Sequence, residues 1–187
     1  TNSHLIMSKL SPSNNKNNIV LIGHMGSGKS TLGSYLAKKI DYKFIDTDEA
    51  IIEHINMSIN DFFEKYSEKE FRDLEEKTIL KLLENNTQHV IAFGGGAFQN
   101  IKVRSSVKKN AISVWLKCNL KTLAIRCSKK KNRPLLKNKD IRSVLKELNK
   151  LRIDNFSRAN HIFDVSTKTK SKLTSDIINK LNIYEEN

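Results

Sequence analysis

One segment near the N-terminus has the residue types and spacing to bind phosphate. Residues 23–30 read GHMGSGKS and satisfy the pattern GxxxxGK[ST], directly after an apolar run and at the start of a helix-like segment. In such a phosphate-binding loop (P-loop), backbone N–H groups converge on phosphate oxygens and the helix N-terminus adds partial positive charge. Lys29 would reach the outer phosphates, and the Ser30 hydroxyl could ligate Mg²⁺. The pattern predicts a nucleoside triphosphate site and gives His24 and Met25 no role.

Two carboxylates follow the next apolar run. Asp46 and Asp48 lie two residues apart just past residues 42–45, at the edge where open α/β sheets bind ligands. One could hold Mg²⁺ through water, and the other could accept a proton from a substrate hydroxyl. The alternative for this pair is a solvated turn.

Three further patterns could complete a site for an anionic substrate. Arg72 and Glu75 lie three apart on one helix face, where a surface ion pair is the alternative. The glycine triplet at 94–96 follows a strand, so its backbone can approach a ligand closely. Residues 129–139 carry six bases and no acid, and they either close over nucleotide phosphates as a lid or form a mobile basic loop.

The elements that must position these residues are short strands alternating with helices. Each strand is an apolar run bounded by turn residues, which is typical of a buried parallel strand. The segments between them have helical periodicity, and the longest example carries Phe71, Leu74, Thr78, Ile79, Leu82 and Leu83. The predicted strands are residues 19–22, 42–45, 89–93, 111–116 and 161–165. This alternation predicts an α/β fold with an open sheet.

Composition limits the other possibilities. The 187 residues fit one domain, and no apolar run approaches the roughly 18 residues that a spanning helix needs. Cys118 and Cys127 match neither a CxxC pair nor a disulfide framework, so we expect packed or idle thiols and a reducing compartment. We expect residues 1–18 to be a disordered tail in which residues 1–6 are a cloning scar and Met7 is the native start; the alternative is an organelle signal.

The net charge of +13 comes entirely from the second half of the chain. Residues 1–101 hold 11 bases and 13 acids, whereas residues 102–187 hold 22 bases and 7 acids. Such asymmetry indicates nucleic acid, an anionic membrane surface or a polyphosphate substrate as a partner, or lysine-rich solvated helix faces.

Taken together, these residues resemble the shikimate kinase family over residues 19 to about 167. The matching motifs occur in family order: GxxGxGKS, D-[ST]-D at 46–48, FRxxE at 71–75, the glycine triplet, and RPLL at 133–136. The resemblance implies a three-layer P-loop kinase fold with a five-stranded parallel sheet in a single domain at 19–187. It also implies helices that bind shikimate at about 47–85 and a mobile lid at about 127–140.

The implied activity is ATP-dependent phosphorylation of the 3-hydroxyl of shikimate, a step of aromatic amino-acid biosynthesis, in a cytoplasmic monomer without nucleic-acid or membrane partners. The implied catalytic residues are Lys29, Asp48 and Arg133, and one Mg²⁺ would lie at Ser30 and, through water, at Asp46. The implied ATP-binding residues are Gly26, Ser27, Gly28, Lys29, Ser30, Thr31, Arg126, which would stack on adenine, and Arg133. The implied shikimate-binding residues are Asp48, Arg72, Gly94, Gly95, Gly96 and Arg152.

The sequence departs from the family pattern around Arg152. The family has an R-x-P-x-Y-like segment there, whereas residues 152–156 read RIDNF. Arg152 is the predicted second carboxylate-binding arginine, with Lys150 and Arg158 as alternatives.

Two other functions are compatible with a P-loop. One is another small-molecule kinase, such as a gluconate kinase, and the other is a nucleic-acid-binding ATPase that uses the basic half. Against the latter, that half has one tryptophan, Trp115, within an apolar run and lacks the interleaved aromatic residues of single-strand platforms.

Overall fold

The computed structural model describes residues 17–85, 87–130 and 140–183. Its strands form one parallel sheet in the order β2-β3-β1-β4-β5. The strands are β1 (Asn18–Ile22), β2 (Lys43–Asp46), β3 (His89–Ala92), β4 (Ala111–Lys117) and β5 (His161–Asp164). The predicted α/β fold with a five-stranded parallel sheet is confirmed, and each strand lies within a residue or two of its predicted bounds.

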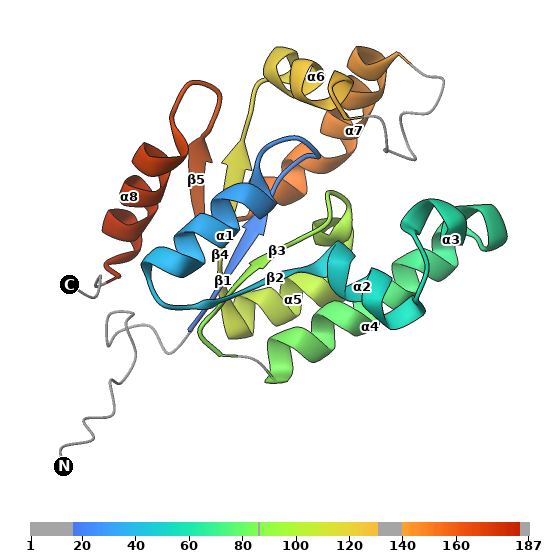
Figure 1. Cartoon of the computed structure of the whole chain (residues 1–187), viewed down its shortest axis with the longest axis horizontal. Helices are drawn as coiled ribbons and strands as arrows, with labels where there is room; N and C mark the ends of the chain where they lie inside the picture. Colours follow the sequence, from blue (N-terminus) through green and yellow to red (C-terminus); the bar gives the residue numbers. More distant parts are fainter. Residues whose placement is uncertain (1–16, 86, 131–139, 184–187) are drawn as a thin grey trace.

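Helices cover both faces of the sheet, so the molecule has three layers (Figure 1). On β1, Ile19 and Leu21 pack toward α1 (Lys29–Lys39) and α8 (Lys170–Leu181). Val20 and Ile22 pack on the opposite face, toward α4, α5 and α7. These three helices are α4 (Glu68–Asn85), α5 (Ile101–Asn110) and α7 (Ile141–Phe156). Burial on both faces is the physical reason that β1 is an uninterrupted apolar run.

Strand β1 begins at Asn18, whereas the sequence predicts a disordered tail over residues 1–18. The prediction is therefore wrong at residue 18. Asn18 is buried, its Nδ2 donates to the Asn110 carbonyl (3.4 Å) and its Oδ1 accepts from the His89 N–H (3.2 Å). The side chain therefore satisfies backbone groups next to two neighbouring strands, which explains a polar residue in the core. Residues 1–16 of the predicted tail lie outside the described residues.

A smaller core lies beside the sheet, where α2 (Thr47–Ile55), α3 (Ile59–Lys65) and α4 pack together (Figure 1). Its fully packed members are Ile51, Phe62 and Phe71. These helices occupy the segment predicted to bind the second substrate, residues 47–85.

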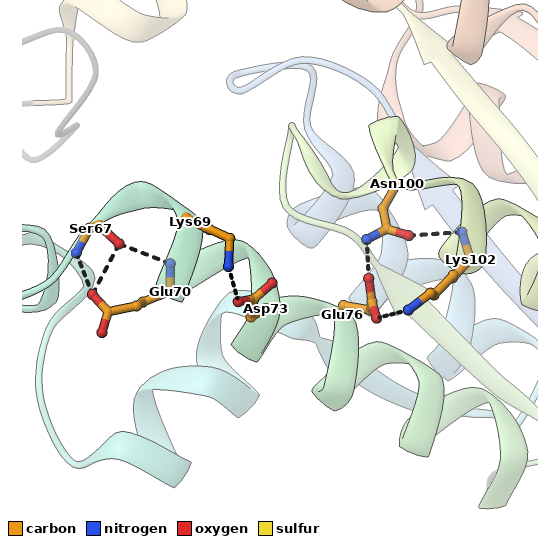
Figure 2. A network of polar contacts seen from close by, with 7 residues as sticks. All are labelled: Ser67, Lys69, Glu70, Asp73, Glu76, Asn100 and Lys102. Carbon is orange, nitrogen blue, oxygen red and sulfur yellow. Dashed lines mark hydrogen bonds and ion pairs between the residues drawn. The ribbon is translucent and has the colours of Figure 1, made fainter.

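Polar contacts fix α4 at its start and along its length (Figure 2). Ser67 and Glu70 form a capping box: the Ser67 N–H donates to Glu70 Oε2 (2.8 Å) and the Glu70 N–H donates to Ser67 Oγ (3.2 Å). Further along, Glu76 accepts from Asn100 Nδ2 (2.5 Å) and Lys102 Nζ (3.2 Å) at the start of α5. The helix that carries the FRxxE residues is thereby held against the body of the protein.

The remaining helices flank the loops at the carboxyl ends of the strands. They are the short 3₁₀ helix η1 (Ala97–Gln99) and α6 (Leu120–Ser128), which packs on α7 through Leu123 and Leu145. The predicted lid includes residues 131–139, and thus Arg133, which lie outside the described residues. Within the described ranges, we find no helix with the length and apolarity needed to cross a membrane.

Candidate active site

The P-loop joins β1 to α1 and wraps its lysine. Gly26 (φ 79°) and Gly28 (φ 94°) adopt left-handed backbone conformations that strain other residues, so the motif glycines are required by the turn itself. The buried Lys29 ammonium donates to the carbonyls of Gly23 (2.8 Å) and His24 (2.9 Å). These two hydrogen bonds hold the Lys29 side chain against the loop that carries it.

The two predicted magnesium ligands, Ser30 and Asp46, are in contact with each other at the start of α1 and the end of β2. Ser30 Oγ donates to Asp46 Oδ2, while Asp46 Oδ1 caps α2 by accepting from the N–H groups of Asp48 (2.9 Å) and Glu49 (3.3 Å). In the described part of the chain, no three His, Cys, Asp or Glu side chains cluster as a metal cage. One hydroxyl and one carboxylate fit Mg²⁺, which keeps waters and takes substrate phosphates as ligands.

A cavity of about 600 Å³ opens over the P-loop. It is lined by Gly26, Ser27, Gly28, Lys29, Ser30 and Thr31, and by five cationic side chains, Arg126, Lys129, Lys130, Lys168 and Lys170. Arg126 also donates from Nη1 to the Gly26 carbonyl (3.3 Å). All the predicted nucleotide-binding residues that the structure describes line this one cavity, whose charge suits a polyphosphate.

A second cavity, of about 490 Å³, lies between α2, α3, α4 and α7. Its lining combines apolar side chains, Ile52, Ile59, Phe63 and Phe71, with charged ones, Asp48, Arg72, Glu75 and Arg152. Met25, Asp48, Gly94, Gly95 and Lys130 line both cavities. The two cavities therefore meet at Asp48 and the glycine triplet.

The glycine triplet lets charged side chains approach the end of β3. A Cβ at Gly94 would lie 2.7 Å from Asp48 Oδ1, and one at Gly95 would lie 3.0 Å from Arg152 Nη1. The Gly94 N–H donates to the buried Thr47 Oγ1 (3.0 Å), which joins the ends of β3 and β2. The triplet is glycine because side chains from other elements fill the space that a Cβ needs.

Arg72 and Glu75 form an ion pair whose carboxylate is buried and whose guanidinium is half-buried, rather than the surface pair considered as the alternative. Their Nη1 and Oε1 atoms are 2.7 Å apart, and the Glu75 side chain is 4% exposed. Burial raises the pKa of Glu75, although the adjacent Arg72 guanidinium opposes this shift. The pair holds the Arg72 guanidinium at the cavity wall, against Gly96.

Arg152 is the second guanidinium at this cavity. Arg152 is 5% exposed, and its buried Nη1 has no hydrogen-bond partner among the described residues. Burial, reinforced by the nearby Arg72, lowers the pKa of Arg152 to about 10. Of the two alternatives, Lys150 pairs with Glu147 on the surface and Arg158 is exposed. A buried guanidinium with a free Nη1 donor among the described residues is suited to a ligand carboxylate.

Asp48 is the carboxylate at the junction of the cavities. Burial raises its pKa to about 6, and the neighbouring carboxylates of Asp46 and Glu75 add to the shift, while Lys29 and Arg72 oppose it. Such a group is ionised at neutral pH yet basic enough to accept a proton.

Sequence reasoning missed several lining residues. Met25 lies at a variable position of the P-loop motif, and Lys168 and Lys170 come from the segment after β5, for which no motif gave a signal.

Trp115 is buried and Cys127 packs beneath Gly26, so Trp115 offers no stacking platform and Cys127 offers no exposed thiol.

Comparisons with known proteins agree with this geometry. Residues 25–182 match the family model described as shikimate kinase. The chain is 39% identical over 163 residues to the shikimate kinase of Mesorhizobium japonicum, which covers 87% of this chain and 80% of the relative. The structure of shikimate kinase from Acinetobacter baumannii in complex with shikimate superposes with a TM-score of 0.86 at 30% identity, over 90% of this chain and 94% of that one.

A gluconokinase from Sinorhizobium meliloti, with a TM-score of 0.63 at 20% identity over 89% of this chain and 91% of that one, shows a shared fold alone. The P-loop, the paired cavities and the matched residues 25–182 thus lead to one assignment: the chain belongs to the shikimate kinase family.

Proposed function

We propose that this chain transfers the γ-phosphoryl group of ATP to the 3-hydroxyl of shikimate, giving shikimate 3-phosphate and ADP. The observation that carries the proposal is the meeting of the two cavities at Asp48: a polyphosphate site lies on one side, and a site with the half-buried Arg72 and the buried Arg152 lies on the other. Direct transfer between two substrates requires such adjacency, because the reacting atoms must be about 3–3.5 Å apart.

ATP binds over the P-loop, with its phosphates on the backbone N–H groups of residues 26–31 and its adenine beside Arg126. On binding, Lys29 exchanges the carbonyls of Gly23 and His24 for phosphate oxygens. Ser30 and Asp46 would hold Mg²⁺, which neutralises phosphate charge when bound.

Shikimate occupies the second cavity. Arg72 and Arg152 bind its carboxylate, because two guanidiniums provide the planar forks that a carboxylate matches. The apolar lining residues contact the carbon ring, and Asp48 with the glycine triplet binds the hydroxyl side. This orientation directs one hydroxyl toward the nucleotide cavity.

In the reaction, Asp48 accepts the proton of the 3-hydroxyl as that oxygen forms its bond to the γ-phosphorus. The bond from the γ-phosphorus to the bridging oxygen breaks, and ADP leaves with the bonding electrons. Lys29 stabilises the charge that develops on the transferred group. Arg133 lies outside the described residues, and its catalytic role and the closing of the lid over residues 127–140 remain predictions.

A substrate panel tests the proposal. ADP formation coupled to a spectrophotometric readout should depend on shikimate, with gluconate giving no more than the background ATPase rate. Faster turnover with a sugar acid would reassign the enzyme. ATPase activity stimulated by nucleic acid and suppressed by salt would instead support the nucleic-acid alternative. We also propose a monomeric, cytoplasmic enzyme, which size-exclusion chromatography and cell fractionation test.

A further inference from the structure

The P-loop motif leaves its second position free, and this chain places a buried histidine there. His24 is 3% exposed, although it lies in a loop beside the nucleotide cavity. Its Nε2 lies 3.0 Å from Asn149 Oδ1, so the ring donates a hydrogen bond to helix α7. A buried polar ring in this position requires a reason beyond filling space.

The ring is packed as well as bonded. It packs edge-on against Phe156, with ring centroids 5.1 Å apart and ring planes at 83°. Phe156 in turn packs against Trp115, with ring centroids 5.6 Å apart. Burial lowers the pKa of His24, and the cations Arg152 and Lys29 lower it further, although the Asn149 bond opposes them. The lowered pKa favours the neutral imidazole, which adds no positive charge next to Arg152 and Lys29.

The hydrogen bond joins the two halves of the active site. On the P-loop side, the His24 carbonyl accepts from Lys29 Nζ. On the α7 side, Asn149 lies three residues before Arg152, nearly one helical turn away. Arg152 has no protein partner at Nη1 among the described residues, so its position depends on where α7 lies.

We propose that His24 is a positioning residue: its hydrogen bond to Asn149 sets α7, and with it Arg152, at a fixed place relative to the P-loop. This inference rests on the proposed function for the role of Arg152 toward the substrate. The bond makes the shikimate-binding guanidinium sensitive to the conformation of the loop that binds ATP.

A double-mutant cycle tests the proposal. His24→Phe keeps an aromatic ring against Phe156 and removes the N–H donor, and Asn149→Leu removes the acceptor. Each single substitution should raise KM for shikimate about five-fold, the usual scale for one hydrogen bond, and the double variant should resemble either single variant. Asn149→Asp keeps an acceptor oxygen at this position, so its KM for shikimate should stay near the parent value.

Two results would contradict the positioning role of His24. If His24 were purely structural, its substitution would lower the amount of active enzyme, and therefore the apparent kcat, while KM for shikimate stayed constant. Additive effects of the two substitutions would show that the side chains act separately. His54→Phe, the same change at an exposed position on α2, is the matched control and should leave both constants unchanged.

Hydrogen exchange tests the connection without shikimate. Binding of Mg²⁺ and ADP to the parent should slow amide exchange in residues 145–152, and this protection should weaken in His24→Phe. Equal protection in both proteins, or none in the parent, would overturn the proposal. Should the parent lack shikimate-dependent activity, the proposed function fails, whereas the exchange experiment still decides whether His24 connects the loop to α7.

Discussion

Asp48 and Glu75 approach the same glycine from two different helices. A Cβ on Gly94 would lie 2.7 Å from Asp48 Oδ1 and 3.1 Å from Glu75 Oε2, so both carboxylates lie against the same glycine after the end of β3. Burial raises the pKa of Asp48 to about 6, and the negative charges of Asp46 and then Glu75 add to this rise, while Lys29 and Arg72 oppose it. The site therefore makes its base stronger by keeping a second negative charge beside it.

Asp48→Asn should lower kcat by about 10²-fold or more, because an amide cannot accept the hydroxyl proton. In the parent, kcat/KM should fall as pH drops through about 6, as the carboxylate becomes protonated. Steady-state kinetics between pH 5 and 8 check both statements. Asp154→Asn, at an exposed position, is the control, and a near-normal kcat for Asp48→Asn would show that this carboxylate is not the base.

Asp48→Asn should also stabilise the fold at neutral pH. The folded-state pKa of Asp48 is raised from 3.8 to about 6, so its stability contribution is fully present below pH 3.8 and is lost as pH rises through about 6. The replacing amide does not titrate, so the urea midpoint of Asp48→Asn should exceed that of the parent more at pH 7.5 than at pH 4. A difference that does not depend on pH would contradict the raised pKa.

Lys29→Ala should abolish phosphoryl transfer while the protein stays folded. The ammonium donates to two carbonyls within its own loop, so we expect intact circular dichroism and loss of turnover by about 10³-fold. Lys39→Ala, at the exposed end of the same helix, should retain parent activity. Unchanged turnover in folded Lys29→Ala would refute the assigned role.

Gly96→Ala should weaken shikimate binding selectively. Its backbone (φ −99°, ψ −7°) suits any residue, but the added Cβ would lie 2.7–2.8 Å from the Arg72 guanidinium and displace it from Glu75. We expect KM for shikimate to rise about ten-fold or more while KM for ATP stays constant. A parallel rise in both constants would indicate a general distortion instead.

Ser30→Ala and Asp46→Asn should each raise the Mg²⁺ concentration needed for half-maximal activity, by about ten-fold. Asparagine still caps α2, so Asp46→Asn separates loss of the charge from loss of the helix cap. Magnesium titration of activity is the measurement, with Ser34→Ala on the exposed face of α1 as the control. An unchanged titration would place the metal elsewhere.

The sequence allowed prediction of the parts of this fold that depend on local pattern. Strands buried on both faces must be apolar runs, and the P-loop needs glycine where φ is positive, so β1 and residues 23–30 were readable directly. The start of β1 at Asn18 could not be predicted, because asparagine is typical of loops and its partners at Asn110 and His89 are not evident from the sequence.

Parts of the site that depend on long-range packing could not be read in this way. The spacing of Arg72 and Glu75 shows that they are neighbours on one helix but not that the glycine triplet covers them. Likewise, the segment RIDNF departs from the family pattern, and the burial of Arg152 follows from how α7 packs rather than from its neighbours in sequence. His24 gave no signal because its bonding partner lies 125 residues away.

The shared boundary of the two cavities has a consequence for inhibitor design. Met25, Asp48, Gly94, Gly95 and Lys130 line both, and the cavities measure about 600 and 490 Å³. A single compound that joins a nucleoside diphosphate to a carboxylate-bearing ring by a short linker would fill both cavities. Because such a compound loses its translational and rotational freedom once rather than twice, it should bind far more tightly than either half alone.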